Sequence, residues 1–257
     1  MTGSIEFDHD DGAARLTLSN PGKRNAISAD MWRELLRVAG EVADDPAIRC
    51  VIVEGADGTF SAGADIAGFD TGRSGSGAGA YDDLLEDALA ALEAMPKPVI
   101  AAVAGPCMGA GAALAAACDF RVAEEAAFFA VPPARLGIGY DPRGVARLVR
   151  VFGDAATREL LFLGERMTAD RAHQIGAVHK LATQGEVRLA ADALAGIIAA
   201  RAPLTIAAAK AALSEIAGRY RPSEEILRFA EIANQSADYA EGRAAFAEKR
   251  PPRFVGK

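Results

Sequence analysis

The chain has 257 residues, of which 51% are hydrophobic, so it can bury a large core in one domain or in one domain with an appendage. Its formal net charge is −7 and no segment is basic, which argues against binding to nucleic acid. The cysteines lack a CxxC pattern, the histidines lack metal-ligand spacing, and the acidic N-terminus is unlike a signal peptide. We therefore expect a cytoplasmic protein with reduced, buried thiols and no metal site.

The N-terminal part of the chain predicts a hairpin, a helix and a strand. Apolar residues alternate on both sides of Asp11-Gly12, which is a hairpin signal. Ser28 can cap a helix whose apolar residues share one face, namely Met31, Leu35, Val38 and Val42. An apolar run over residues 50–53 then predicts a buried strand.

Two Gly/Ala-rich turns each follow a predicted strand. The first turn spans residues 60–66 (FSAGADI), and the second spans residues 104–111 (AGPCMGAG) after a strand predicted at 99–103. Small residues let the backbone approach a ligand closely, and a helix that starts at such a turn directs free N–H groups toward negative charge. Two such turns together could hold one oxyanion between two N–H groups, an arrangement that stabilises an enolate or a tetrahedral intermediate.

The segment between these turns predicts a loop followed by a helix. Residues 71–80 (TGRSGSGAGA) are rich in Gly and Ser and poor in apolar side chains, which predicts a mobile surface loop. Residues 81–95 have the pattern of an amphipathic helix, and Pro96 ends it.

The second half of the chain is predicted to be mainly helical. A helix to Cys118 and two short strands, at 120–122 and 127–129, precede Gly153, after which helical patterns dominate. Arg201-Ala202-Pro203 predicts a break between helices, because proline is favoured near a helix start.

Residues 99–118 carry no charge and are about long enough to span a membrane. Pro106 and several glycines interrupt the run, and most of its other residues are alanines, which insert weakly. We therefore expect a buried strand, a turn and a buried helix here, and no membrane span.

Five short segments of this chain match, in their order and spacing, a set of segments found together in a known protein family. They are residues 20–27 (NPGKRNAI), 60–66 (FSAGADI), 97–105 (KPVIAAVAG), 118–121 (CDFR) and 241–250 (EGRAAFAEKR). With these segments the chain resembles the enoyl-CoA hydratase/isomerase family, also called the crotonase family. The resemblance runs from Asn20 nearly to the C-terminus.

This resemblance implies an α/β fold with a crotonase-type spiral of strand-strand-helix units over residues 1–200. It implies a C-terminal helical trimerisation region over residues 201–257, and hence a homotrimer or a dimer of trimers. It also implies an acyl-CoA thioester as the substrate, bound in a bent pose, and no metal, nicotinamide or flavin cofactor.

By the same resemblance, Ala64 and Ala110 are the residues whose backbone N–H groups form the oxyanion hole. A backbone donor needs only a small side chain, so both positions fit this role. The alternative is that the small residues serve only tight strand–helix packing. A dinucleotide-binding loop at residues 109–111 is a rival interpretation, but its third glycine is missing.

Five residues, two just before the first predicted helix and three in the first Gly/Ala turn, match family positions that contact coenzyme A. Lys23 and Arg24 match contacts to the CoA phosphates, which cations suit. Ala62, Asp65 and Ile66 match a strip that faces the adenine. As alternatives, the two cations are an ordinary solvated pair, and Asp65 is only a helix cap.

Two residues near the C-terminus match family positions that reach the CoA of a neighbouring subunit. They are Phe246 and Lys249, and Lys210 is a weaker candidate of the same kind. The alternative for Phe246 and Lys249 is an ordinary amphipathic helix face.

The chain departs from the family at the positions that carry chemistry. Family hydratases use two glutamates, and these positions fall on Ala113 and Pro133, neither of which can transfer a proton. Asp141 is the one acid left in this motif, and it falls where some family isomerases carry an aspartate acid/base. The alternative is that Asp141 caps a following helix or pairs with Arg143 on the surface.

Three functions remain open at this point. The favoured one is isomerisation of an enoyl-CoA, in which Asp141 removes a proton from one carbon and returns it to another while the two N–H groups stabilise the enolate. The second is an enoyl-CoA hydratase that uses Asp141 or a substrate-held water in place of the glutamates. The third is a non-catalytic acyl-CoA-binding homologue.

Overall fold

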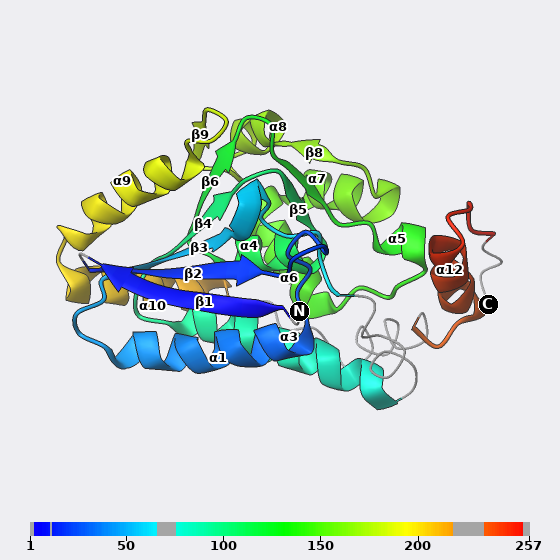
Figure 1. Ribbon diagram of the computed structural model, residues 1–257, viewed down its shortest axis with the longest axis horizontal. Coiled ribbons are helices and arrows are strands. Elements are labelled where there is room, and N and C mark those ends of the chain that lie inside the picture. Colours follow the sequence, from blue (N-terminus) through cyan, green and yellow to red (C-terminus); the bar gives the residue numbers. More distant parts are fainter. Residues whose placement is uncertain (1–2, 11, 66–75, 218–233, 254–257) are drawn as a thin grey trace.

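The computed structural model describes residues 3–10, 12–65, 76–217 and 234–253, and in them it shows two β-sheets flanked by helices (Figure 1). The larger sheet has the strand order β1-β2-β3-β4-β6-β9 and the smaller one β5-β7-β8. The strands of the larger sheet are β1 (Ser4–Asp10), β2 (Ala13–Ser19), β3 (Cys50–Gly55), β4 (Val99–Val103), β6 (Phe120–Glu124) and β9 (Lys180–Ala182). The smaller sheet contains β5 (Pro106–Met108), β7 (Phe128–Ala130) and β8 (Met167–Thr168).

The larger sheet begins with the predicted antiparallel hairpin of β1 and β2 and is parallel from β2 onward. Helices cover both of its faces, because successive strand residues point to opposite sides. Val51 and Val53 join the core formed with α1 (Ala29–Asp44), α3 (Ser76–Ala94) and α4 (Ala110–Ala117). Cys50 and Ile52 join a second core that includes α9 (Val187–Ala199).

Most of the described chain after Gly153 is helical, as predicted, with β8 and β9 as short additions. A 3₁₀ turn (Ala56–Gly58) follows β3, and the later helices are α5 (Pro133–Leu136), α6 (Pro142–Phe152), α7 (Asp154–Arg158), a π-type turn (Glu159–Leu163), α8 (Ala169–Gln174), α10 (Pro203–Ala217) and α12 (Ala237–Ala247). The predicted helix break at residues 201–203 is confirmed, since α9 ends at Ala199 and α10 begins with Pro203.

Several local predictions are confirmed by the contacts of single residues. The Ser28 hydroxyl accepts the Met31 N–H at 3.3 Å and so caps α1, whose predicted apolar face is buried. The three cysteines are buried free thiols, and burial raises the pKa of Cys50 to about 11 and that of Cys118 to about 12. These thiols are therefore protonated and unreactive at neutral pH.

The uncharged segment 99–118 folds as β4, β5 and α4, of which β4 is fully buried and β5 and α4 are partly or fully buried along their lengths. Within the described ranges, no single helix is long and apolar enough to cross a membrane. The pair α9 and α10 together has the length and composition of a span, but the two helices are bent by 107° relative to each other. The units β4–β5–α4 and β6–β7–α5 each place one strand in the larger sheet, the next in the smaller sheet, and then a helix.

One local prediction is wrong. Residues 71–80 were expected to form a loop, yet residues 76–80 belong to α3, which begins at Ser76. Starting a helix is costly, but each residue added to an existing helix gains a hydrogen bond. The amphipathic part of α3 therefore extends through glycines and a serine that have low helix propensity on their own. Residues 71–75, with the rest of the loop prediction, lie outside the described residues.

The two C-terminal helices have different environments. Lys210 of α10 is buried, and its Nζ donates to the carbonyls of Leu92 (3.2 Å) and Lys97 (3.0 Å) and to Asp119 Oδ2 (2.7 Å). Because these three acceptors use its three N–H donors, Lys210 holds α10 to the core, and its role toward coenzyme A stays a prediction. The division of the chain at residue 200 stays a prediction.

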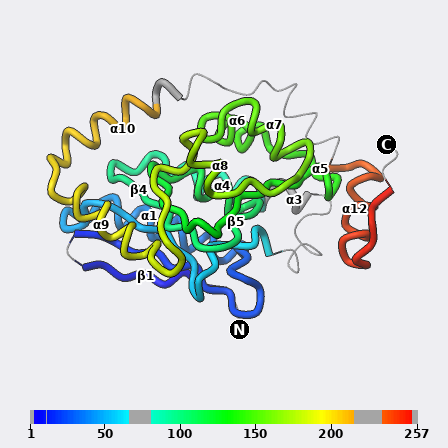
Figure 2. Tube along the Cα trace, turned by 90° about the horizontal axis from the view of Figure 1, so that it is seen from above, coloured from blue at the N-terminus to red at the C-terminus, as the bar shows by residue number. Residues whose placement is uncertain are grey.

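Helix α12 lies at one end of the molecule in both views (Figures 1 and 2). It packs on the end of α5, where a Cβ at Gly242 would lie 2.2 Å from the Leu136 carbonyl oxygen. Only glycine permits this approach. Asn234, just before α12, accepts the Gly139 N–H through Oδ1 at 2.9 Å. These contacts fix the segment between α5 and α6, which carries Asp141.

Candidate active site

The first Gly/Ala turn runs beside β5 as a short parallel pair. The Ser61 N–H donates to the Pro106 carbonyl at 3.0 Å, and the Met108 N–H donates to the Ser61 carbonyl at 3.0 Å. The Ser61 hydroxyl donates to the Asn25 carbonyl at 2.8 Å and accepts the Gly63 N–H at 3.2 Å. Two turns that are far apart in the sequence are thereby held side by side.

Ile27 fixes the peptide that carries the Ala64 N–H. Its N–H donates to the Gly63 carbonyl at 2.7 Å, and its carbonyl accepts the Asp65 N–H at 2.9 Å. A trans peptide is planar, with its C=O and N–H pointing in opposite directions. Holding the Gly63 carbonyl toward Ile27 therefore directs the Ala64 N–H away from Ile27.

The second turn begins α4 at Ala110. Gly63 has φ +109°, and a Cβ there would lie 3.1 Å from the Met108 carbonyl oxygen and 3.9 Å from the Ala110 nitrogen. The Gly109 carbonyl accepts the Ala113 N–H at 3.0 Å, so the peptide before Ala110 is aligned with the helix. Within the part of the chain that the structure describes, neither the Ala64 N–H nor the Ala110 N–H forms a hydrogen bond.

The two positions expected for glutamates lie near these turns and carry no acid. Ala113 is buried in α4, one turn after Ala110, and Pro133 is the buried first residue of α5. β5 and β7 are parallel, with Met108 paired to Ala130. The segments that lead to Ala113 and to Pro133 therefore both leave the smaller sheet at the carboxyl ends of its parallel strands. The site therefore lacks the two carboxylates of the family hydratase pattern.

Four of the five predicted CoA-binding residues near the first turn are brought together. The Ala62 N–H donates to the Arg24 carbonyl at 2.9 Å, and Lys23 Nζ lies 2.7 Å from Asp65 Oδ2. The Lys23 side chain stays 46% exposed, whereas that of Asp65 is only 13% exposed. Lys23 is therefore paired and still accessible to solvent. Ile66 lies outside the described residues.

Phe246 and Lys249 are both exposed, and they lie in α12 and just after it. α12 occupies one end of the molecule, apart from β2 (Figure 1). The role of Phe246 and Lys249 toward coenzyme A stays a prediction.

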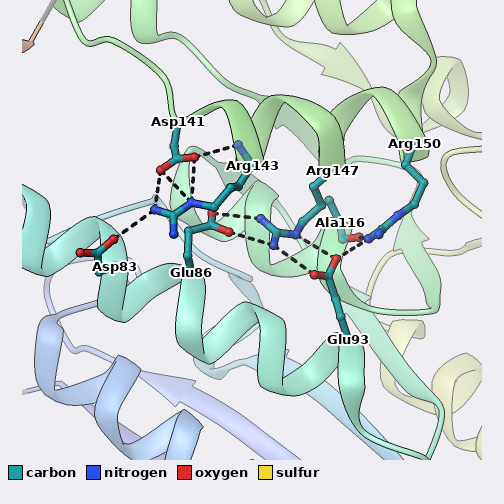
Figure 3. A network of polar contacts seen from close by, with 8 residues as sticks. All are labelled: Asp83, Glu86, Glu93, Ala116, Asp141, Arg143, Arg147 and Arg150. Carbon is teal, nitrogen blue, oxygen red and sulfur yellow. Dashed lines mark hydrogen bonds and ion pairs between the residues drawn. The ribbon is translucent and has the colours of Figure 1, made fainter. Parts of the chain in front are cut away.

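Asp141 is both a helix cap and a partner of Arg143 (Figure 3). Its Oδ1 accepts the backbone N–H of Arg143 at 2.7 Å, and its two oxygens accept from Nε and Nη2 of the same side chain at 2.7–3.1 Å. Arg143 Nη2 also donates to Asp83 of α3 at 3.2 Å. The carboxylate remains 23% exposed. Both structural alternatives for Asp141 are therefore present, and neither tests its role as a proton carrier.

Behind Arg143, a buried ion network joins α6 to α3 (Figure 3). Arg147 makes a two-pronged pair with Glu86 at 3.0 and 3.1 Å and also donates to Glu93 at 3.0 and 3.1 Å. Arg150 donates to Glu93 as well. Burial alone would raise the pKa of Glu93, but the hydrogen bonds and charges of Arg147 and Arg150 bring this pKa below its usual value of 4.5.

Asn25 is a positioning residue that sequence reasoning missed. Its backbone has φ +55°, and its side chain is buried. The side-chain amide donates to the carbonyls of Ala56 (2.9 Å) and Thr59 (2.6 Å), and its oxygen accepts the Asn20 N–H (3.1 Å). These bonds hold the Lys23–Arg24 turn against the start of the first Gly/Ala turn. Its acceptors lie 31 and 34 residues further along the chain, so no local pattern predicts them.

Comparisons with known proteins identify the family. The model of the family named Enoyl-CoA hydratase/isomerase matches residues 8–257. The chain is 34% identical over 259 residues to a crotonyl-CoA hydratase of Syntrophomonas wolfei, covering 99% of this chain and 98% of that protein. The chain therefore belongs to the enoyl-CoA hydratase/isomerase family, as the resemblance predicted.

Solved structures show the same fold. An enoyl-CoA hydratase/carnithine racemase from Magnetospirillum magneticum is 36% identical with a TM-score of 0.81, over 98% of this chain and 96% of that one. Methylmalonyl-CoA decarboxylase in complex with 2-nitronate-propionyl-CoA is 28% identical with a TM-score of 0.91, over 100% of both chains. The predicted crotonase fold is thus confirmed.

The pKa of Glu93 predicts how stability depends on pH. Because the folded-state pKa is lowered, the paired carboxylate stabilises the fold above pH 4.5, and this contribution is lost as pH falls through the lowered pKa. We expect Glu93→Gln to cost about 2 kcal/mol at pH 7. Urea unfolding should show a smaller difference between parent and variant near pH 3.

The control for this prediction is Asp87→Asn, which removes an exposed carboxylate from the same helix. It should change stability little at either pH. A Glu93→Gln cost that is the same at both pH values would contradict the assigned pairing.

Proposed function

We propose that this protein is an acyl-CoA enzyme that binds the thioester carbonyl oxygen between the N–H groups of Ala64 and Ala110. The observation that carries this proposal is the pair of adjacent turns whose two N–H groups have no hydrogen-bond partner among the described residues. Backbone donors held in place before reaction stabilise a developing oxyanion without reorganisation. The intermediate is a thioester enolate.

The reaction is a shift of a C=C bond, with Asp141 as the proton carrier. Asp141 takes a proton from the carbon next to the thioester carbonyl, and the electron pair moves to the carbonyl oxygen to give the enolate. Asp141 then returns the proton at the far end of the conjugated system. This role is supported by the absence of a carboxylate at Ala113 and Pro133 and by the partial exposure of Asp141.

Coenzyme A is part of the substrate and takes no part in the proton transfer itself. In the proposal, Lys23 and Arg24 contact its phosphates, and Ala62, Asp65 and Ile66 face its adenine. Two observations support one CoA-binding surface formed by these residues: the side chain of Lys23 is exposed, and a backbone hydrogen bond joins Ala62 to Arg24. The proposed chemistry uses no metal or redox cofactor.

The second candidate is hydration of a 2-enoyl-CoA. The relative named crotonyl-CoA hydratase favours it. Hydration needs a group that holds and deprotonates water, and without acids at Ala113 and Pro133 this task also falls to Asp141 or to the substrate.

Loss of CO₂ from a 2-carboxyacyl-CoA is a further candidate, because the departing CO₂ leaves its electron pair on the enolate and no base is required. The structural similarity to methylmalonyl-CoA decarboxylase favours it.

A panel of substrates separates these functions. The panel contains 2-enoyl-CoA and 3-enoyl-CoA isomers and methylmalonyl-CoA, with products resolved by liquid chromatography. Interconversion of the enoyl isomers supports the proposal, whereas a hydroxyacyl product or CO₂ release selects one of the other two reactions. Firm thioester binding without turnover would indicate a non-catalytic homologue.

Ala110→Pro tests the oxyanion hole directly. Proline removes the backbone N–H but is well tolerated as the first residue of a helix, which is the place of Ala110 in α4. We expect kcat to fall about 10²–10³-fold, the usual effect of losing one oxyanion donor. Circular dichroism should show a folded protein, and free CoA should bind as in the parent. Unchanged turnover would exclude Ala110 as a donor.

Asp141→Asn tests the proton carrier. Asparagine keeps the cap of α6 and a hydrogen bond to Arg143, but it cannot cycle a proton at neutral pH. We expect turnover to fall about 10²–10⁴-fold while binding of the CoA thioester is retained. Asp87→Asn, which removes an exposed carboxylate from α3, is the control and should keep the parent rate. Equal rates for Asp141→Asn and the parent would leave Asp141 as a cap only.

We also propose a homotrimer or a dimer of trimers, in which Phe246 and Lys249 reach the coenzyme A of a neighbouring subunit. Leu204 and Leu213 of α10 are 85% and 67% exposed, and Phe246 is 56% exposed, so apolar surface on the C-terminal helices remains to be covered. Light scattering at micromolar concentration should give a trimer or hexamer mass. A monomer at that concentration would rule out the proposal.

A further inference from the structure

Tyr81 of α3 connects two helices to the backbone beside Ala64. Its hydroxyl donates to the Ile27 carbonyl at 3.1 Å and accepts the indole N–H of Trp32 at 3.0 Å. Trp32 lies in α1 and is fully buried, and Ile27 is 1% exposed. A continuous hydrogen-bonded chain therefore runs from α1 through α3 to Ile27.

Ile27 is the residue that holds both peptides flanking Ala64. Its carbonyl accepts from the Asp65 N–H and from the Tyr81 hydroxyl, and its N–H donates to the Gly63 carbonyl. Any rotation of the Ile27 backbone would therefore turn the Gly63–Ala64 peptide and the N–H that this peptide carries.

The two proposed donors differ in how they are held. Ala110 is fixed as the first residue of α4 by helical hydrogen bonds, such as the one from Ala113 to the Gly109 carbonyl. Ala64 lies outside any helix or regular strand, and among the described residues its one backbone pairing is an isolated bridge with Ile27. Its N–H therefore depends on the hydrogen bonds made by Ile27 and Tyr81.

We propose that Tyr81 is a positioning residue, which holds the Ala64 N–H in the direction required for the enolate oxygen through its hydrogen bond to Ile27. This inference rests on the proposed function of the Ala64–Ala110 pair and adds to it a residue that touches neither substrate nor reacting atoms. A phenylalanine would fill the same space but leave both the Ile27 carbonyl and the Trp32 N–H without this partner.

The experiment measures enolate binding, so it does not depend on which reaction the enzyme performs. The probes are 2-nitronate-propionyl-CoA, whose planar anion next to the thioester resembles an enolate, and propionyl-CoA, which is neutral at that position. Calorimetry on the full chain gives the ratio of the two affinities. In Tyr81→Phe we expect nitronate binding to weaken about 10-fold, less than the loss of a whole donor, with propionyl-CoA affected less than about 2-fold.

Two further variants complete the test. Tyr239→Phe removes a hydroxyl from a buried tyrosine in α12 and should leave the affinity ratio at the parent value. Trp32→Phe removes the donor to Tyr81 together with part of a fully buried ring, so it should lower stability but lower the affinity ratio less than Tyr81→Phe does, and it provides the test if Tyr81→Phe does not fold.

The outcomes separate this inference from the proposed function. If the parent prefers the nitronate and the Tyr81→Phe ratio matches that of the parent, Tyr81 has no positioning role. Equal weakening of both probes would overturn the inference in favour of a purely structural tyrosine. If the parent itself shows no preference for the nitronate, the proposed oxyanion hole fails, and the role of Tyr81 fails with it.

Discussion

The site depends on one constraint, which is the fixed orientation of the Gly63–Ala64 peptide. Ile27 binds this peptide from one side, while the pairing of Ser61 with β5 places it against the start of α4 on the other. A Cβ at Gly63 would lie only 3.1 Å from the Met108 carbonyl oxygen, and φ +109° is strained for any residue with a side chain, so the approach of the two turns favours glycine there. The Gly/Ala content of both turns follows from this close approach.

The charged network between α3 and α6 supports the elements that carry the proposed site. Arg147 lies between Glu86 and Glu93 with a 6% exposed side chain, and breaking such a pair would leave a buried charge uncompensated. The network fixes the relative position of two helices that each contribute to the site. α3 carries Tyr81, whose hydroxyl donates to the Ile27 carbonyl beside the Ala64 peptide, and Asp141 caps the start of α6. The buried ions therefore relate the proposed oxyanion donor to the proposed proton carrier.

Local patterns in the sequence predict those features whose cause is local. Ser28 caps α1 because its partner, the Met31 N–H, is three residues away, and the two Gly/Ala turns follow their strands as expected. The helical state of residues 76–80 was missed because it extends a helix stabilised further along the chain. The hydrogen bonds of Lys210 were not foreseen for a similar reason, since its acceptors lie 91 to 118 residues away.

Asp141 shows why a sequence alone leaves a catalytic assignment open. Its cap to α6 and its pair with Arg143 both come from residues two positions away, and a proton carrier at the same place would have the same local sequence. The structure adds Asp83, which approaches Arg143 from α3. When Asp141 takes up a proton in the proposed reaction, Arg143 therefore keeps a counter-charge. The cost of neutralising Asp141 is lower than it would be for an isolated ion pair, because the guanidinium is not left unpaired.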